Sequence, residues 1–346
     1  MPFGTKTLND GKKIPAIAFG TGSRYKMMDV TRFVEQAIDV GFTHIDTAQC
    51  ALRDRGRVVL RVLSASTNSS HTQSSSERQS RSAVWRGLRC MSPRNRTGPE
   101  GRCTKTSRTV CPKCLGLKFV DLYLIHNPRF FNDLDSVWRE FEAIQEAGLA
   151  KSIGVSNFTL KPLQSLVRNA RVIPAVNQIE FHPYNWAQNK EMVEWSTEQG
   201  ILTAGYSSLT SITKYPGGPV DAPVAAAAAR HGISPTQVLL LWARAKGVVI
   251  VTTTSNKGRL EEYLATGDLP PLSPEEVAAI DEAGAQGPPT TVWSRLADSG
   301  HAAKFALGTA VMRNRGTAKV FALALFCAVG WYGLRAMWAV CEHVRS

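Results

Sequence analysis

The chain has 346 residues, 43% of them apolar and 20% charged, with a formal net charge of +13. This length and composition allow a substantial core, which excludes a mainly disordered protein and suits one large α/β domain or two small ones. The charge is uneven, because residues 51–113 hold 12 Arg and 2 Lys against 2 Glu and 1 Asp. The rest of the chain is close to neutral, so the basic excess gives no reason to expect a nucleic-acid partner.

Apolar runs and helical patterns alternate along most of the chain. The strands expected from these runs are residues 14–19, 42–46, 120–125, 152–156, 174–180, 202–207 and 248–253. Helices are expected from Asp29 to Gly41, around Val137, Phe141 and Ile144, over residues 160–168, 190–198, 235–246 and 257–265, and after Ser273. Seven or eight strand-helix units favour a closed (β/α)₈ barrel, and no Gly-x-Gly-x-x-Gly follows a strand to support an open dinucleotide-binding sheet.

Polar side chains follow several of the expected strands. Asp46 ends the second strand and His126 follows the strand at 120–125. Ser156, Asn157 and Gln178 end two more. Reactive residues of such barrels lie at the carboxyl ends of the strands, so this set is a candidate site. A lone histidine beside a strand is more often structural, but the combination is harder to explain in that way.

Four phrases carry a resemblance to a known family. They are GFTHIDTAQ at 41–49, LGLKFVDLYLIHNP at 115–128, AGLAKSIGVSNF at 147–158 and NQIEFHPY at 177–184. In these phrases the chain resembles the aldo-keto reductases, across residues 1–50 and 115–285. The resemblance implies a (β/α)₈ barrel that reduces aldehydes or ketones with NADPH, without a metal, through an aspartate, tyrosine, lysine and histidine tetrad. Asp46 and His126 match the aspartate and the histidine.

The resemblance also implies where the cofactor binds. Cofactor contacts are expected at Thr21, Ser156, Asn157, Gln178, Tyr206, Ser207, Leu209, Thr254, Ser255, Asn256 and Arg259. In the loop at 252–259, Thr253 stands where family members often carry lysine, and Lys257 is an alternative source of positive charge. An alternative interpretation of the same loop is a helix N-terminus with ordinary Ser/Thr capping.

Residues 51–114 do not match the family. The family's tyrosine is expected just after Cys50 and its lysine about thirty residues further on, yet no tyrosine occurs between Tyr25 and Tyr123. We therefore expect a barrel disrupted around its third strand. Three interpretations stay open: an error in the gene's reading frame or exon structure, a genuine disordered Ser/Arg-rich insertion, or a zinc site formed by Cys90, Cys103, Cys111 and Cys114.

The C-terminal region suggests a membrane anchor. Residues 320–334 are fifteen positions without a charge, and basic residues precede them. We expect a linker at 286–317 and a transmembrane tail anchor at 318–341, with a docking or amphipathic helix as the alternative. The polar first thirteen residues lack a secretory pattern, so the expected location is the cytoplasmic face of a membrane, or else the soluble cytoplasm.

Two functional hypotheses follow from these observations. The first is an NADPH-dependent reductase acting on a small carbonyl substrate as a monomer. The second is a cofactor-binding or interaction protein without catalytic activity, which the missing tyrosine and lysine favour.

Overall fold

The computed structural model describes residues 2–22, 29–48, 85–90 and 119–289. By its contacts the chain divides into Met1–Pro288 and Pro289–Ser346, and the described fold belongs to the first unit. The expected linker and tail anchor lie outside the described residues, apart from the first four positions of the linker. Within the described ranges, none of the helices is both long and apolar enough to cross a bilayer.

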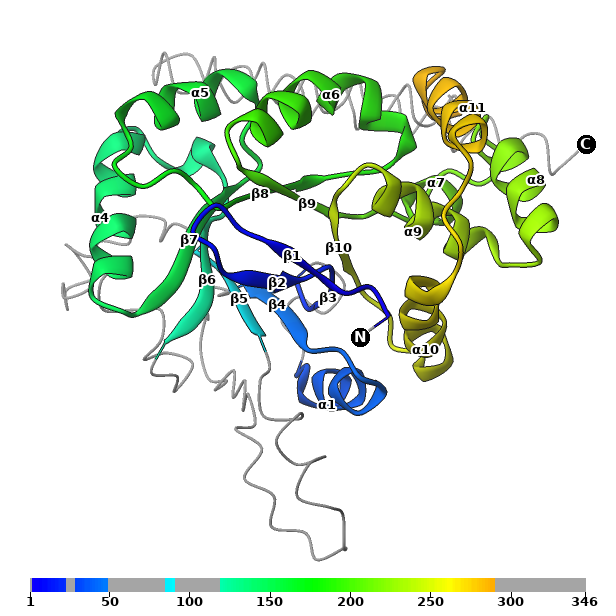
Figure 1. Ribbon diagram of the computed structural model, residues 1–346, viewed down its shortest axis with the longest axis horizontal. Helices are drawn as coiled ribbons and strands as arrows, with labels where there is room; N and C mark the ends of the chain where they lie inside the picture. Colours follow the sequence, from blue (N-terminus) through cyan, green and yellow to red (C-terminus); the bar gives the residue numbers. More distant parts are fainter. Residues whose placement is uncertain (1, 23–28, 49–84, 91–118, 290–346) are drawn as a thin grey trace, which may run out of the picture. The chain divides into compact units, whose positions relative to one another are not determined.

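Eight parallel strands close into a barrel, as expected (Figure 1). In order around the barrel they are β3 (Ile17–Gly20), β4 (His44–Ala48), β5 (Trp85–Cys90), β6 (Val120–Ile125), β7 (Ala150–Ser156), β8 (Val176–Glu180), β9 (Leu202–Tyr206) and β10 (Val249–Thr252), and β10 pairs with β3. The outer helices are α1 (Thr31–Val40), α4 (Leu134–Glu146), α5 (Leu160–Asn169), α6 (Pro183–Glu198), α8 (Asp221–His231), α9 (Pro235–Ala245), α10 (Lys257–Ala265) and α11 (Pro274–Ala285). Short helical turns are η2 (Pro128–Phe130), α7 (Thr210–Thr213) and η3 (Thr266–Asp268).

The barrel contains a third strand, β5, at the place around which a disruption was expected. Strand β5 pairs with β4 from His44 opposite Trp85 to Ala48 opposite Arg89, and with β6 up to Cys90 opposite Ile125. A parallel ladder is made by backbone N–H and C=O groups, so it tolerates a run whose side chains give no buried-strand pattern. Residues 49–84, between β4 and β5, lie outside the described residues.

Strand β6 shows how the barrel is packed on both faces. Leu122 and Leu124 point into the barrel with the apolar residues of β8, β9 and β10. Tyr123 and Ile125 pack outward against the helices, and the Tyr123 ring stacks on Phe141 of α4 with 4.6 Å between ring centroids. This alternation between two buried faces explains the nearly continuous apolar run in the sequence.

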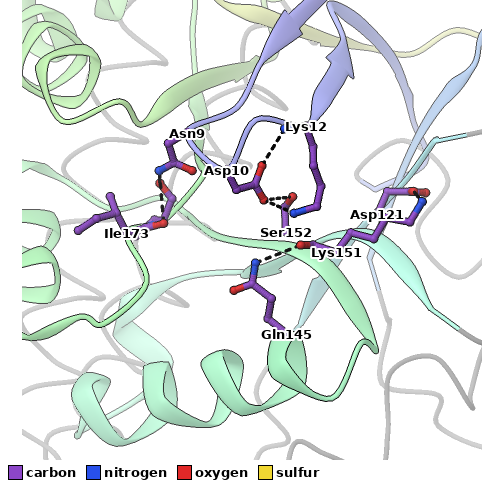
Figure 2. A network of polar contacts seen from close by, with 9 residues as sticks. Asn9, Asp10, Lys12, Asp121, Gln145, Lys151, Ser152 and Ile173 are labelled. Atoms are coloured by element: carbon purple, nitrogen blue, oxygen red, sulfur yellow. Dashed lines mark hydrogen bonds and ion pairs between the residues drawn. The ribbon is translucent and has the colours of Figure 1, made fainter.

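A hairpin covers the amino end of the barrel. Strands β1 (Thr5–Thr7) and β2 (Lys13–Pro15) pair antiparallel, and their turn brings Asp10 close to the start of β7 (Figure 2). The Asp10 carboxylate accepts hydrogen bonds from Lys12 Nζ at 2.7 Å and Ser152 Oγ at 2.6 Å. Asn9 donates to the carbonyl of Pro174 at 3.1 Å. The hairpin thus closes the barrel end opposite the expected site.

Helix termini follow the expected signals closely. Ser234 and Ser273 each form a capping box at the start of α9 and α11, with proline at the first helical position. Gly41 ends α1 with a positive φ of 118°. Asp29 lies one residue before the assigned cap and accepts a hydrogen bond from the backbone of Thr31 at 2.9 Å.

Candidate active site

The floor of the site is a contact across the barrel mouth. Asp46 lies in β4 and Gln178 lies in β8, four strands away around the closed barrel. The Gln178 amide Nε2 donates to Asp46 Oδ1 at 3.3 Å, and the two residues are 3% and 1% exposed. Each buried side chain therefore helps to satisfy the other's hydrogen-bonding capacity.

Asn157 joins the ends of three strands. Its Nδ2 donates to the His126 carbonyl at 2.8 Å and to Ser156 Oγ at 3.1 Å. Its Oδ1 accepts from the Tyr206 hydroxyl at 2.8 Å. Asn157 has a φ of 61°, a left-handed conformation that asparagine tolerates better than most residues. Since Ser156 also donates to the Gln178 carbonyl at 2.8 Å, these side chains form one network.

His126 stands at the edge of this network. Its ring lies parallel to that of Phe130, with centroids 6.0 Å apart and planes 8° apart. Phe130 is 49% exposed, so the pair borders solvent. A hollow of about 440 Å³ shares Asn157 with the network and is lined by Asn127, Pro128, Arg129, Leu134, Asn157, Thr159 and Pro162. The hollow is lined by Asn127, the residue after His126, and not by the histidine itself.

Thr21 ties the end of β3 to β4. Its backbone N–H donates to the Asp46 carbonyl at 2.9 Å, and its hydroxyl donates to Thr47 Oγ1 at 2.8 Å. Thr21 is thus held beside the Asp46 end of the site by contacts of its own.

The loop after β9 follows Tyr206 directly. Ser207 has a φ of 63° and its carbonyl accepts from the backbone of Thr210 at 3.0 Å, which starts the short helix α7. Leu209 packs partly against the core. The hydroxyls of Ser208 and Ser211 are buried and have no hydrogen-bond partner among the described residues. These two serines were not among the expected site residues, and their position next to the expected ones was the available signal.

The loop after β10 forms a separate group at the start of α10. Asn256 caps the helix, since its Oδ1 accepts from the Arg259 backbone at 3.3 Å. Thr254 is 4% exposed, and its Oγ1 accepts from the Asn256 backbone at 3.2 Å. Gln36 of α1 donates to the Ser255 carbonyl at 3.4 Å. The capped helix start foreseen as an alternative is present, and its dipole favours an anion there.

The buried polar atoms at the strand ends fit a nicotinamide group. Gln178 Oε1 is buried and has no hydrogen-bond partner among the described residues. Because buried polar atoms are nearly always hydrogen-bonded, a donor from a ligand is the natural complement. A carboxamide supplies both a donor and an acceptor, which suits Gln178 together with Ser156 and Asn157.

The cysteines of the zinc interpretation cannot be placed. Cys103, Cys111 and Cys114 lie outside the described residues, and only the backbone of Cys90 is described. In the described ranges, no three His, Cys, Asp or Glu side chains are gathered in a way that would hold a metal.

A parallel eight-stranded barrel with polar side chains at the carboxyl ends of its strands is typical of enzymes. The model of the Aldo/keto reductase family matches residues 1–285. The chain therefore belongs to the aldo/keto reductase family of oxidoreductases.

Individual relatives support the family assignment. The chain is 38% identical over 154 residues to an NAD/NADP-dependent indole-3-acetaldehyde reductase from Schizosaccharomyces pombe, which covers 43% of this chain and 54% of that relative. It is 32% identical over 319 residues to glycerol 2-dehydrogenase (NADP(+)) from Hypocrea jecorina, covering 80% and 91%. The solved structure of a Bombyx mori aldo-keto reductase in complex with NADP is similar at a TM-score of 0.63 and 27% identity, covering 81% of this chain and 92% of that one.

Proposed function

We propose that this protein reduces an aldehyde or ketone to an alcohol, with NADPH as the hydride donor. The observation that carries the proposal is the network of Asp46, Gln178, Ser156, Asn157 and Tyr206 at the strand ends. Its polar atoms suit a carboxamide. The reductases among the relatives, and the NADP held by the Bombyx mori structure, support the same cofactor.

The roles proposed for the cofactor contacts follow the position of each group. Ser156, Asn157 and Gln178 hold the nicotinamide carboxamide, and the Tyr206 ring packs on the nicotinamide face. Thr21 lines the same end of the site. The remaining contacts are Ser207 and Leu209 along the pyrophosphate, and Thr254, Ser255, Asn256 and Arg259 around the adenosine phosphate.

The proposed roles of His126 and Asp46 concern the substrate end. Hydride from bound NADPH turns a carbonyl into an alkoxide, which needs a hydrogen-bond donor while charge develops on its oxygen. His126 follows β6 at the edge of the network, where its carbonyl accepts from Asn157, and is proposed to orient the substrate carbonyl through its ring. Asp46 is buried at the floor, where its carboxylate favours a neighbouring cation or donor.

The proton donor is what separates this proposal from the second candidate. A tyrosine is absent between Tyr25 and Tyr123, and no lysine occurs between Lys26 and Lys105. An alkoxide formed without a proton donor returns its hydride, so these absences favour a protein that binds the nucleotide without reducing a carbonyl.

Two measurements on the full chain distinguish the candidates. Titration with NADPH, followed by nicotinamide fluorescence, measures binding, and NADPH oxidation with a simple aldehyde measures turnover. Turnover supports the reductase, whereas binding without turnover supports the second candidate. An Ala51→Tyr variant tests the missing acid, because residue 51 is where the family's tyrosine is expected. A gain in turnover with unchanged NADPH affinity assigns the defect to proton transfer.

We also propose that residues 318–341 anchor the protein to a membrane, because residues 320–334 carry no charge. The expected result is that the full chain leaves membranes only with detergent, while a chain ending at residue 317 does not need it. Release of the full chain by alkaline carbonate alone contradicts the anchor.

A further inference from the structure

The segment proposed to hold the adenosine 2′-phosphate is electrically neutral. From Thr253 to Glu262 the chain carries two cations, Lys257 and Arg259, and two anions, Glu261 and Glu262. We infer that this protein discriminates weakly between NADPH and NADH, binding the two with affinities within about tenfold of each other. The inference rests on the proposed function, because it concerns the same nucleotide site.

Contacts within α10 and to α9 leave still less positive charge available to bind a phosphate. Lys257 Nζ lies 3.9 Å from Glu261 Oε1, one turn along the helix. Glu262 accepts a hydrogen bond from Ser234, which fixes a second carboxylate on this helix. Arg259 has no ion-pair partner within the described ranges, so its guanidinium is the cation left for a phosphate.

The neighbouring polar side chains cannot replace the missing charge. Thr254 Oγ1 and Asn256 Oδ1 accept backbone N–H groups of the loop and the first helical turn. Gln36 of α1, which reaches the carbonyl of Ser255, is also neutral. Helix α1 as a whole carries Arg32 against Glu35 and Asp39, and therefore adds no net positive charge. The dipole of α10 attracts anions, but it does so weakly and salt screens it.

Thr253 is the position where discrimination is lost. It follows the last residue of β10, and its hydroxyl is buried without a hydrogen-bond partner among the described residues. A phosphate monoester carries about −1.5 to −2 charges at neutral pH, which a neutral hydroxyl cannot balance. Charge-assisted hydrogen bonds from lysine or arginine are the strong contacts to phosphate. With threonine here, Arg259 is the one cation of residues 253–262 without an ion pair to another described residue, and it is left to meet the phosphate that distinguishes NADPH from NADH.

The test is to titrate the full chain with NADPH and with NADH, following nicotinamide fluorescence at about 0.15 M ionic strength. The native chain is expected to bind the two within about tenfold. Thr253→Lys is expected to tighten NADPH by about tenfold or more and to leave NADH unchanged within about twofold. Thr253→Val, which has the same shape and no charge, is the matched control and keeps the native ratio of NADPH affinity to NADH affinity. Arg259→Gln weakens NADPH more than NADH.

Native binding of NADPH about a hundredfold tighter than NADH overturns the inference. So does a folded Thr253→Lys variant with an unchanged preference. The ratio of NADPH affinity to NADH affinity in the native chain tests the inference even when a variant misfolds. A thermal melt of each variant shows whether it is folded. If neither nucleotide binds the native chain, the proposed function is refuted, and this inference with it.

Discussion

His44 makes the stability of the barrel depend on pH in a range where carboxylates stay ionised. It lies in β4 at 3% exposure, and its Nδ1 is 3.3 Å from the carbonyl oxygen of Pro15. Burial lowers the pKa of His44 to about 4, against the opposing influences of Asp46, the Pro15 carbonyl and Asp121. The imidazole is therefore neutral in the folded protein at pH 5, whereas it is largely protonated in the unfolded chain.

The magnitude follows from the two pKa values. With about 6.5 in the unfolded chain and about 4 in the folded protein, lowering the pH from 7.5 to 5 reduces the free energy of unfolding by about 2 kcal/mol. The sign is set by proton uptake, because the unfolded state binds more protons below pH 6.5. The full effect is reached once the pH falls below the folded value.

The assay is urea unfolding of the native chain and of a His44→Asn variant between pH 7.5 and 5. Asparagine keeps an amide donor near the Pro15 carbonyl and does not titrate. Any packing defect of the variant shifts its whole curve, so the difference between the two proteins isolates the histidine. The expected difference changes by about 2 kcal/mol across this range. A difference that stays constant to within about 0.5 kcal/mol refutes the reasoning.

Three further predictions concern packing, acid stability and the site. Gly154→Ala places a Cβ 2.5 Å from a backbone carbonyl of β8 and is expected to destabilise the barrel by about 3 kcal/mol in thermal melts, so an unchanged melting temperature contradicts that packing. Burial alone would raise the pKa of Glu276, but hydrogen bonds from His231 and a backbone N–H hold it below its usual value. The stability that ionised Glu276 gives the folded protein is therefore lost as the pH falls below about 4.5. In Glu276→Gln the free energy of unfolding should fall less steeply with pH in this acid range, and an identical fall in both proteins argues against this role of Glu276. Tyr206→Phe, which keeps the ring and removes the hydroxyl that donates to Asn157, should weaken NADPH by less than about threefold, and Tyr206→Ala by more than about tenfold; equal losses exclude ring packing.

The sequence was sufficient to predict those barrel strands that are covered on both faces. Residues 120–125 and 248–253 were expected as strands because most of them are apolar, and β6 and β10 are indeed buried on both faces. The hairpin was missed because the run at 14–19 was treated as one strand, although it divides after Pro15 into β2 and β3. Helix α8 was not expected, since its alanine-rich segment has no strong apolar stripe.

The third strand shows a limit of pattern-based prediction. Arg86, Gly87 and Arg89 interrupt the apolar run, so nothing in the local sequence indicates a barrel strand. Strand β5 is nevertheless held by backbone pairing on both sides, which local patterns do not report.

The same limit applies to the site. The residue types at the strand ends were predicted, but the contact between Asp46 and Gln178 joins positions 132 residues apart. Only the closed barrel brings them together. The bond between Tyr206 and Asn157, 49 residues apart, has the same origin.

Whether the strand ends hold a nicotinamide group is tested most directly by NADPH binding to the native chain and to Gln178→Leu. We predict saturable binding by the native chain and about tenfold weaker binding by the variant, because the variant loses the amide proposed to bind the carboxamide. A thermal melt of the variant checks that the loss of the Asp46 contact leaves it folded. No binding by the native chain, or equal binding by both proteins, would mean that Gln178 does not hold a nicotinamide group.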